Sequence, residues 1–438
     1  MSRTFASLRK HRNYRLFFVG QLVSVSGTWM QMIALAWFVV DLTRSPIAVG
    51  ILAFCRFIPF TLFGLAAGVL ADRFDNRRLM MATQAAAMAV SVALAVLALT
   101  GAAALWHVYL LAALGGTATV FDAPARHALT FQMVGRDELP NAVALNATLF
   151  NASRIVGPAL AGVLIAAAGA GACFLLNAVS FLAVLGALAL MRPAELHPVE
   201  RSETRPTMLR GAREGLAYAR RTRVVWVTLV ITTVLSTIGF NFNVLVPVLA
   251  RETLDAGPQV FGSLSASFGA GALAGALLTA WTGRASWKAL LAGTAGFGIS
   301  VLVLAPMTTV AAAAALLFAA GVCFILWNSN TQSILQLTAP DHLRGRVLSL
   351  FLLAFAGLAP LGGLLAGWLA HVGGTQLAFS AAGVAGLAMA ALGWWKSPYG
   401  PLSFATAGSG SAPPQPSPAP AAGSSQAAPA LRQRPVGR

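Results

Sequence analysis

FDAPARHALTFQMVGRDELPNAVALNATLFNASRIVGPALAGVLIAAAGAGACFLLNAVSFLAVLGALAL, residues 121–190, carries the clearest fold signal in this chain. A charged segment lies between long apolar segments, one of which contains Arg154 and a Gly157-Pro158 bend. Membrane-spanning segments tolerate such residues only where neighbouring helices or a water-filled cavity satisfy them. The segment therefore predicts a polytopic membrane protein with a central passage.

The composition of the whole chain indicates the same class. Of 438 residues, 57% are hydrophobic and 10% are charged, and the mean hydropathy is +0.74. A soluble domain could not cover so much apolar surface. The three cysteines stand singly in apolar runs and the histidines are dispersed, so we expect no metal site, no other cofactor and no enzyme activity. None of the three lysines follows a glycine, which excludes a phosphate-binding loop of the ATP-driven type in this chain.

The apolar runs predict an all-α fold. A bilayer core requires about 20 residues of helix, and about twelve runs reach that order of length. They are residues 16–40, 47–71, 79–100, 105–121, 142–168, 172–191, 224–249, 259–281, 288–305, 309–336, 347–370 and 376–395. The first run is too long for the apolar region of a signal peptide and is interpreted as a retained span.

Charge placement predicts the orientation, because short loops rich in Lys and Arg stay on the cytoplasmic side. With alternating spans, nearly all basic residues fall in the N-terminus, the alternate loops and the C-terminus. Both termini are thus predicted to be cytoplasmic. The net charge of +17 is interpreted as a topology signal, and no nucleic-acid partner is expected, because the arginines are scattered among membrane loops.

The chain also repeats itself over about 200 residues, a pattern typical of transporters built from two halves. TFQMVGRDELPNAVAL from Thr130 resembles ILQLTAPDHLRGRVLSL from Ile334. The repeat predicts two pseudo-symmetric six-helix bundles, 1–191 and 224–400. Residues 192–223 would form a cytoplasmic linker, either an amphipathic helix on headgroups or a solvated hinge. Residues 401–438, rich in Ala, Pro, Ser and Gly, are predicted to be a disordered tail.

GVLADRFDNRR, residues 68–78, and the segment 121–190 resemble the major facilitator superfamily, specifically the branch of bacterial exporters that contains the enterobactin and macrolide efflux proteins. Gly68-x-x-x-Asp72-Arg73 followed by Arg77-Arg78 is similar to the cytoplasmic gate motif of that superfamily. This chain departs from the motif, because it has Asp75-Asn76 and one extra residue where the motif usually has a glycine. The resemblance implies that Asp72 faces the N-terminal dipole of helix 11, near Arg346 and Val347. It also implies that Arg73 or Arg77 pairs with Asp122. The alternative is that these charges only anchor a loop.

A second motif lies in the fifth predicted helix. Gly157-Pro158-x-x-x-Gly162 resembles the antiporter motif of drug exporters, with Ser153 in the place of an upstream glycine. Proline removes a helix hydrogen bond and glycine admits a neighbouring backbone, so the pair predicts a bend that can rock against helix 8.

Superfamily analogy places cavity groups on helices 1, 4, 7 and 10, where polar or aromatic residues interrupt apolar runs. These residues are Gln21, Trp29, Gln31, Thr117, Asn241, Asn243, Asn328 and Asn330. Each could instead hydrogen-bond to an adjacent helix.

Two arginines, Arg56 and Arg154, are predicted to lie deep in the bilayer without an acidic residue at similar depth. They are hypothesised to face the cavity and attract anionic substrate groups, with Asn151 on the face of Arg154. The alternative is that helix-end carbonyl groups and waters hydrogen-bond to both arginines, which would then have a structural role only.

The resemblance implies a monomeric transporter of the bacterial inner membrane that exports a small amphipathic molecule, such as a siderophore or antibiotic, by alternating access. It also implies proton antiport, for which Asp122 and Asp41 are the titrating candidates. Proton-coupled uptake and a non-transporting receptor or scaffold are the competing functions.

Overall fold

The computed structural model describes residues 5–198, 208–283 and 285–397. The predicted tail, 401–438, and part of the predicted linker lie outside these residues. Every regular element in the described part is helical. Their bounds are α1 (Ala6–Lys10), α2 (Arg12–Thr43), α3 (Pro46–Arg73), α4 (Asn76–Thr100), α5 (Leu105–Ala189), η1 (Pro193–Glu195), α6 (Met208–Arg221), α7 (Arg223–Val234), η2 (Leu235–Gly239), α8 (Phe242–Val248), η3 (Leu249–Thr253), α9 (Pro258–Thr282), α10 (Trp287–Leu304), α11 (Val310–Thr338), α12 (Asp341–Leu352), η4 (Leu353–Gly357) and α13 (Ala359–Trp395).

Two of these helices contain more than one pass across the bundle. Within α5 the backbone leaves helical geometry at Gly135 (φ 71°) and Gly169 (φ 79°), and within α13 it does so at Gly374 (φ 67°). Glycine is suited to these breaks because it has no Cβ to oppose a positive φ. The described residues contain nine helical stretches long and apolar enough to cross a membrane, and the three breaks divide them into about twelve passes. The predicted all-α, multi-pass fold is confirmed.

The structure differs from the predicted boundaries where the chain becomes polar. Residues 122–141, expected as a charged loop, are helical on both sides of the break at Gly135. Similarly, α12 begins at Asp341, six residues before the predicted start of helix 11. Hydropathy detects only the apolar part of a helix, whereas the backbone hydrogen bonds continue into water beyond the apolar part.

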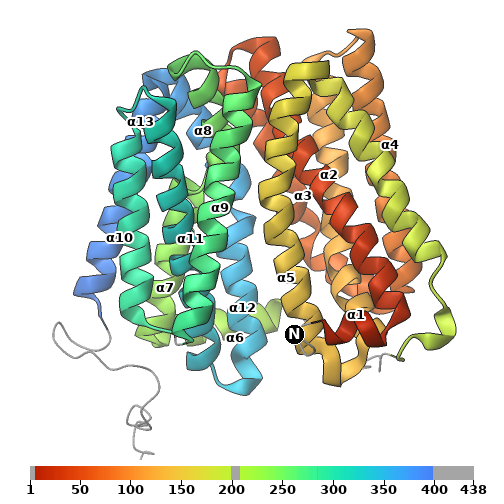
Figure 1. Ribbon diagram of the computed structural model, residues 1–438. Helices are drawn as coiled ribbons and strands as arrows, with labels where there is room; N and C mark the ends of the chain where they lie inside the picture. The colour runs from red at the N-terminus through yellow and green to blue at the C-terminus, as the bar shows by residue number, and fades with distance from the viewer. Residues whose placement is uncertain (1–4, 199–207, 284, 398–438) are drawn as a thin grey trace, which may run out of the picture.

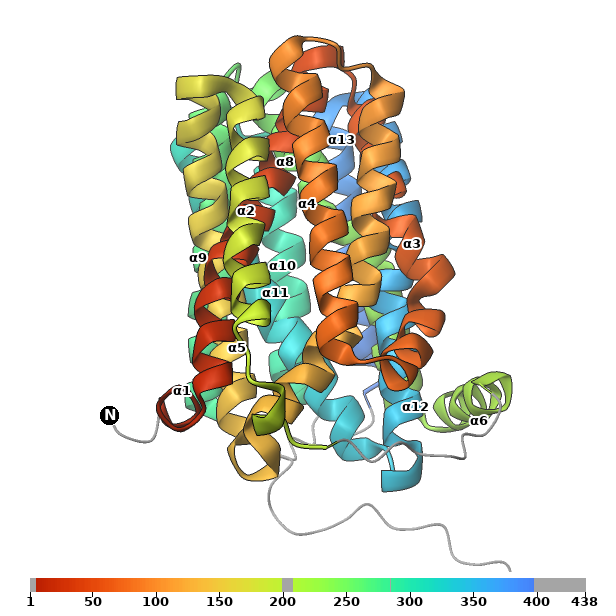
Figure 2. The ribbon, with the colours of Figure 1, turned by 90° about the vertical axis from the view of Figure 1, so that its right-hand side faces the viewer.

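The helices form two bundles that stand side by side (Figure 1). One contains α1 to α5 and the other α7 to α13, and α6 lies across one end of the molecule (Figure 2). The N-terminus and the end of the described chain lie at that same end (Figure 1). Helix α6 is fixed there by an ion pair between Glu214 and Arg346 and by a hydrogen bond of 2.9 Å from the Tyr218 hydroxyl to the Thr338 carbonyl oxygen.

The two bundles approach each other closely at the opposite end. A Cβ added at Gly162 would lie 2.9 Å from the Pro258 carbonyl oxygen and 3.0 Å from the Cα of Gly262. A Cβ added at Gly50 would lie 2.8 Å from the Gly363 carbonyl oxygen. Such backbone-to-backbone approach is typical of small-residue interfaces between membrane helices. The contacts close the molecule at the end remote from α6.

An ion pair also connects the bundles at this closed end. Arg251 of η3 lies 3.3 Å from Asp41 of α2, and its guanidinium lies 5.8 Å from the ring centroid of Trp37. Trp37 in turn stacks on Phe261 of α9, with ring centroids 5.8 Å apart. Because Asp41 is 57% exposed, the ion pair contributes little stability by itself, and the packed rings supply most of the contact.

Candidate substrate cavity

A cavity of about 450 Å³ lies between the bundles. This volume lies in the range of small-molecule pockets, which is roughly 300–1,000 Å³. Residues of both bundles line it, and many are aromatic. The aromatic lining residues are Trp29, Phe57, Phe60, Phe150, Phe181, Phe240, Phe242, Phe261, Phe268 and Phe355. Such a wall can accommodate a flat apolar ligand, while a few polar groups determine its orientation.

Three uncharged polar side chains form one cluster in the wall. The Gln31 Oε1 accepts hydrogen bonds of 2.7 Å from the Ser91 hydroxyl and of 2.7 Å from Asn177 Nδ2. The residues come from α2, α4 and the last pass of α5. Because each buried polar group costs free energy without a partner, the cluster holds these three helices in one register.

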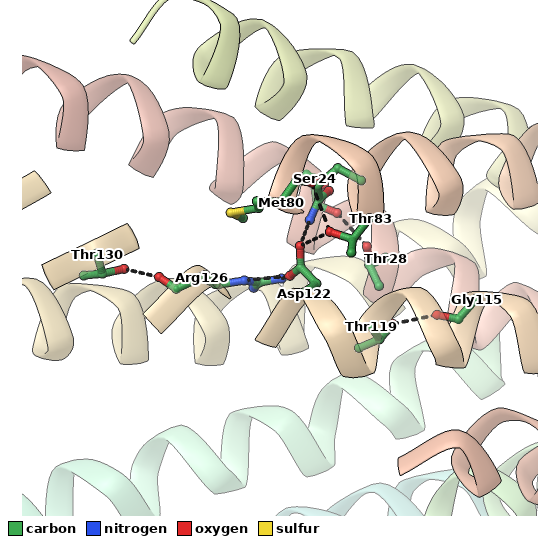
Figure 3. Close-up of polar contacts among 10 residues, drawn as sticks. Ser24, Thr28, Met80, Thr83, Gly115, Thr119, Asp122, Arg126 and Thr130 are labelled. Carbon is green, nitrogen blue, oxygen red and sulfur yellow. Dashed lines mark hydrogen bonds and ion pairs between the residues drawn. The ribbon is translucent and has the colours of Figure 1, made fainter. Parts of the chain in front are cut away.

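Asp122 forms a second cluster on the first pass of α5 (Figure 3). It is 3% exposed and pairs with Arg126, one helical turn further along, whose Nε lies 3.0 Å from Oδ2. The other oxygen, Oδ1, accepts hydrogen bonds of 3.1 Å from the Thr83 hydroxyl and of 2.8 Å from Gln84 Nε2. All four residues line the cavity. The structure therefore places a hydrogen-bonded carboxylate in the cavity wall.

The predicted partners of Asp122 lie elsewhere in this conformation. Arg77 donates from Nε to the Leu188 carbonyl oxygen at 2.7 Å and from Nη2 to the Ala189 carbonyl oxygen at 3.2 Å. Arg73 is exposed at the end of α3. Arg126, which was not predicted as a partner of Asp122, forms the ion pair in place of Arg73 and Arg77, because an i,i+4 pair on one helix needs no tertiary alignment.

Arg154 lies near the middle of the second pass of α5, more than about 20 Å along the axis from either break at about 1.5 Å per residue. Its guanidinium carbon lies 4.9 Å from the ring centroid of Phe268, 5.5 Å from that of Phe324, 5.6 Å from that of Trp29 and 5.9 Å from that of Phe240. Within the described residues, the Arg154 side chain has neither a hydrogen bond nor an ion pair. Cation–π contacts offset part of the cost of placing a cation there, but they supply no acceptor oxygen.

Arg56 of α3 lines the same cavity. Among the residues that the structure describes, its side chain also has no hydrogen bond or carboxylate partner. A cation at membrane depth is costly unless water, an acceptor or an anion meets it. The two arginines that the sequence predicted to be unpaired therefore both line one central cavity.

The other predicted cavity residues divide into two groups. Trp29, Gln31 and Asn243 line the cavity, together with Pro158 of the predicted bend. Gln21, Thr117, Asn151, Asn241, Asn328 and Asn330 are not among its lining residues. Most of the second group bond to helices: Asn330, for example, accepts from the Ser286 backbone N–H at 2.9 Å and donates to the Leu326 carbonyl oxygen at 2.8 Å.

The residues of the predicted bend pack tightly. A Cβ added at Gly157 would meet the Met30 backbone nitrogen at 2.9 Å, and Gly162 faces Gly262 of α9, the eighth pass. Pro158 is buried beside the cavity. The glycines thus let this pass approach both α2 in its own bundle and α9 in the other.

The predicted gate residues lie at the end of α3 near α6, and this conformation shows little contact there. No heavy atom lies within 4 Å of a Cβ added at Gly68, among the described residues. Arg78 follows Asp75, whose side chain caps α4 by accepting from the Arg78 backbone N–H at 2.8 Å. The side chain of Asp72 lies outside the described part of the structure. Since α12 begins at Asp341, the positive end of that helix lies there and not at Arg346 and Val347.

The cavity residues on α4, which is the third pass, were not predicted from the sequence. The superfamily analogy placed cavity groups only on the first, fourth, seventh and tenth passes. Thr83, Gln84 and Ser91 interrupt an apolar run at intervals of one and seven residues, which places them on roughly one helix face. That spacing was the available signal. In the described residues, no group of three or more His, Cys, Asp or Glu side chains is placed to hold a metal ion.

The helix arrangement and the cavity between two bundles define a multi-pass membrane transporter. The chain belongs to the major facilitator family described as transmembrane secretion effector (MFS_3), which matches residues 2–400. It is 27% identical to the staphyloferrin A transporter of Staphylococcus aureus, over 84% of this chain and 92% of that protein. It is 26% identical to macrolide efflux protein A of Streptococcus pyogenes, over 68% and 74%, and 27% identical to the multidrug efflux pump Tap of Mycolicibacterium fortuitum, over 84% and 91%.

Solved structures support the fold. A peptide transporter, POT, in complex with sulfate superposes with a TM-score of 0.74 at 14% identity, covering 89% of this chain and 94% of that one. The nucleoside transporter NupG superposes with a TM-score of 0.71 at 11% identity, covering 89% and 100%. These likenesses concern the helix arrangement alone.

Proposed function

We propose that this protein exports a small amphipathic molecule from the cytoplasm by alternating access, as a proton antiporter. One observation carries the proposal: a cavity lined by both bundles lies below a tight glycine interface that closes one end. A cavity shared by two bundles can be exposed to either side when the bundles rock. Relatives named for macrolide and multidrug efflux favour export over uptake.

The proposed setting is the inner membrane of a bacterium, with both termini in the cytoplasm and the protein acting as a monomer. The distribution of basic residues supports this orientation. With it, α6 and the gate residues lie on the cytoplasmic side, and the glycine interface lies on the outer side. The structure would then represent an inward-facing state.

Asp122 is proposed as the proton-carrying group. Of the two candidates from the sequence, Asp41 is largely exposed and pairs with Arg251 at the closed end, whereas Asp122 is buried in the cavity wall. A group that exchanges a proton with both sides in turn must be reached from the alternating cavity. Asp122 lines the cavity in the conformation described here, which supports this role.

Flux in inside-out membrane vesicles tests the proposed direction. An exporter should accumulate a radiolabelled macrolide or staphyloferrin A in the vesicle lumen when the vesicles are energised, and a protonophore should abolish the accumulation. Loss of preloaded compound on energisation would indicate uptake in the cell. Absence of flux for a panel of such compounds would favour the receptor or scaffold.

The gate assignment predicts that Asp72→Asn reduces efflux at near-normal expression. A carboxylate near a helix N-terminus contributes up to about 2 kcal/mol in partly buried geometry, and its loss would shift the balance between the two states by about thirtyfold. The measurement is efflux per milligram of purified protein in proteoliposomes. Asp75→Asn, which alters only the cap of α4, is the matched control. Equal efflux by both variants would remove Asp72 from the gate.

A further inference from the structure

Arg154 reaches from one bundle to the other. It belongs to the second pass of α5, yet three of the four rings around its guanidinium, Phe240, Phe268 and Phe324, belong to the opposite bundle. The rings of Phe240 and Phe324 are themselves stacked, with centroids 4.3 Å apart. A ligand group held by Arg154 would therefore lie against both bundles at once.

The charges around the cavity do not balance. Among its described lining residues, the charged ones are three arginines and one aspartate, a net charge of +2. Asp122 is already paired with Arg126 and accepts two further hydrogen bonds. Nothing in the described part of the wall is therefore left to neutralise Arg56 and Arg154.

The donors of Arg154 remain available. A guanidinium has five N–H donors in its plane and no acceptor, and ring faces offer no lone pair to receive them. Carboxylate, phosphate and phenolate oxygens match this arrangement of donors, which arginine can engage through two parallel hydrogen bonds. The surrounding aromatic rings make the local environment less polar than bulk water, and this strengthens an interaction between opposite charges.

We propose that the cavity selects an amphipathic organic anion, whose charged group binds Arg154 with support from Arg56 and whose flat apolar part packs on the aromatic wall. This inference rests on the proposed transport function and names the class of its substrate. Arg154 is the specificity-determining residue, because it joins the anion to the aromatic groups of both bundles.

An anionic cargo also affects the driving force. The potential of a bacterial inner membrane is negative inside, so it pushes an anion outward. Export of an anion would thus draw on the membrane potential as well as on any proton exchange.

The test compares two probes of the same shape, naphthalene-2-carboxylate and naphthalene-2-carboxamide. Their binding to the full chain in nanodiscs can be followed by quenching of tryptophan fluorescence, since Trp29 lies against Arg154. We expect the wild-type protein to bind the carboxylate at least about tenfold more tightly than the amide, as a charge-assisted hydrogen bond is about twice as strong as a neutral one. In Arg154→Gln this preference should disappear, while binding of the amide persists.

Two further variants show whether Arg154→Gln loses the preference through a missing contact with the probe or through misfolding. Arg154→Lys retains the charge but not the two-pronged geometry, and it should recover part of the preference. Asn151→Ala, on the same helix but outside the cavity lining, should behave as the wild type. Equal binding of both probes to the wild type, binding of neither, or a preference that survives in Arg154→Gln would overturn the inference.

If the inference on binding is right but the proposed transport function is wrong, binding and transport would give different results. The carboxylate would bind with the expected preference, but no compound would move across energised vesicles. Conversely, vigorous transport of neutral and anionic compounds at equal rates, unchanged in Arg154→Gln, would leave the transport function intact and remove the anion preference.

Discussion

Gly262→Leu should reduce transport about ten- to hundredfold, since overpacking a tight interface costs about 1–3 kcal/mol. A Cβ at this position of α9 would lie 2.7 Å from the Cα of Gly162 and 2.7 Å from the Pro158 carbonyl oxygen. Both neighbours are backbone atoms and cannot rotate away. The larger side chain should hold the two bundles apart at the closed end, so that the state described here becomes rare.

Two measurements check this result. The first is efflux in proteoliposomes, with Gly186→Leu as the control, because no heavy atom of the described residues lies within 4 Å of a Cβ there. The second is labelling of Ala161→Cys, a buried position, by an impermeant thiol reagent in a chain whose three native cysteines are replaced. Gly262→Leu should increase the labelling rate. Normal efflux with unchanged labelling would show that this interface does not separate during transport.

Asp122→Asn should abolish transport driven by a proton gradient and retain exchange of labelled for unlabelled substrate. The asparagine side chain fits the same space and can still meet Thr83 and Gln84, but it cannot bind and release a proton. Breaking a buried ion pair costs about 3–5 kcal/mol, and the cost should be smaller here because Arg126 is 26% exposed. We therefore expect a folded protein in which transport and the gradient are uncoupled.

The control for this experiment is Gln84→Leu, which removes one hydrogen bond to Asp122 but leaves its carboxyl group in place. That variant should keep gradient-driven transport, with at most a modest change in rate. Gradient-driven efflux by Asp122→Asn at the wild-type rate would exclude Asp122 as the proton carrier. Loss of both gradient-driven transport and exchange, together with normal melting in detergent, would assign it to substrate binding instead.

Several elements of the fold could be predicted from local sequence alone. The apolar runs located the spans, because a helix that crosses the bilayer must be apolar over about 20 residues whatever it packs against. The positions at which the passes end could not be read in the same way. The first pass of α5 continues through Asp122 and Arg126, beyond the predicted end at residue 121, because these charged residues satisfy each other on one helix face.

In the candidate site, too, some features could be predicted from the sequence and others could not. Arg56 and Arg154 were predicted to lack an acidic partner, and among the described residues neither side chain has a hydrogen bond or an ion pair. The aromatic residues around Arg154 could not be predicted, since Trp29, Phe240, Phe268 and Phe324 are separated by up to about 300 residues of chain. Asn241 and Asn330 looked equally suited to the cavity, but their side chains bond to nearby backbone.

The sequence by itself determined the class of protein, the approximate spans and the presence of arginines at membrane depth. These properties depend on the free energy of moving each residue from water into lipid, which is local and approximately additive. Tertiary structure alone decided which polar groups share the cavity, that Arg126 pairs with Asp122, and that Gly162 faces Gly262. These outcomes depend on how helices distant in the chain rotate and pack against one another, and no local preference specifies that rotation.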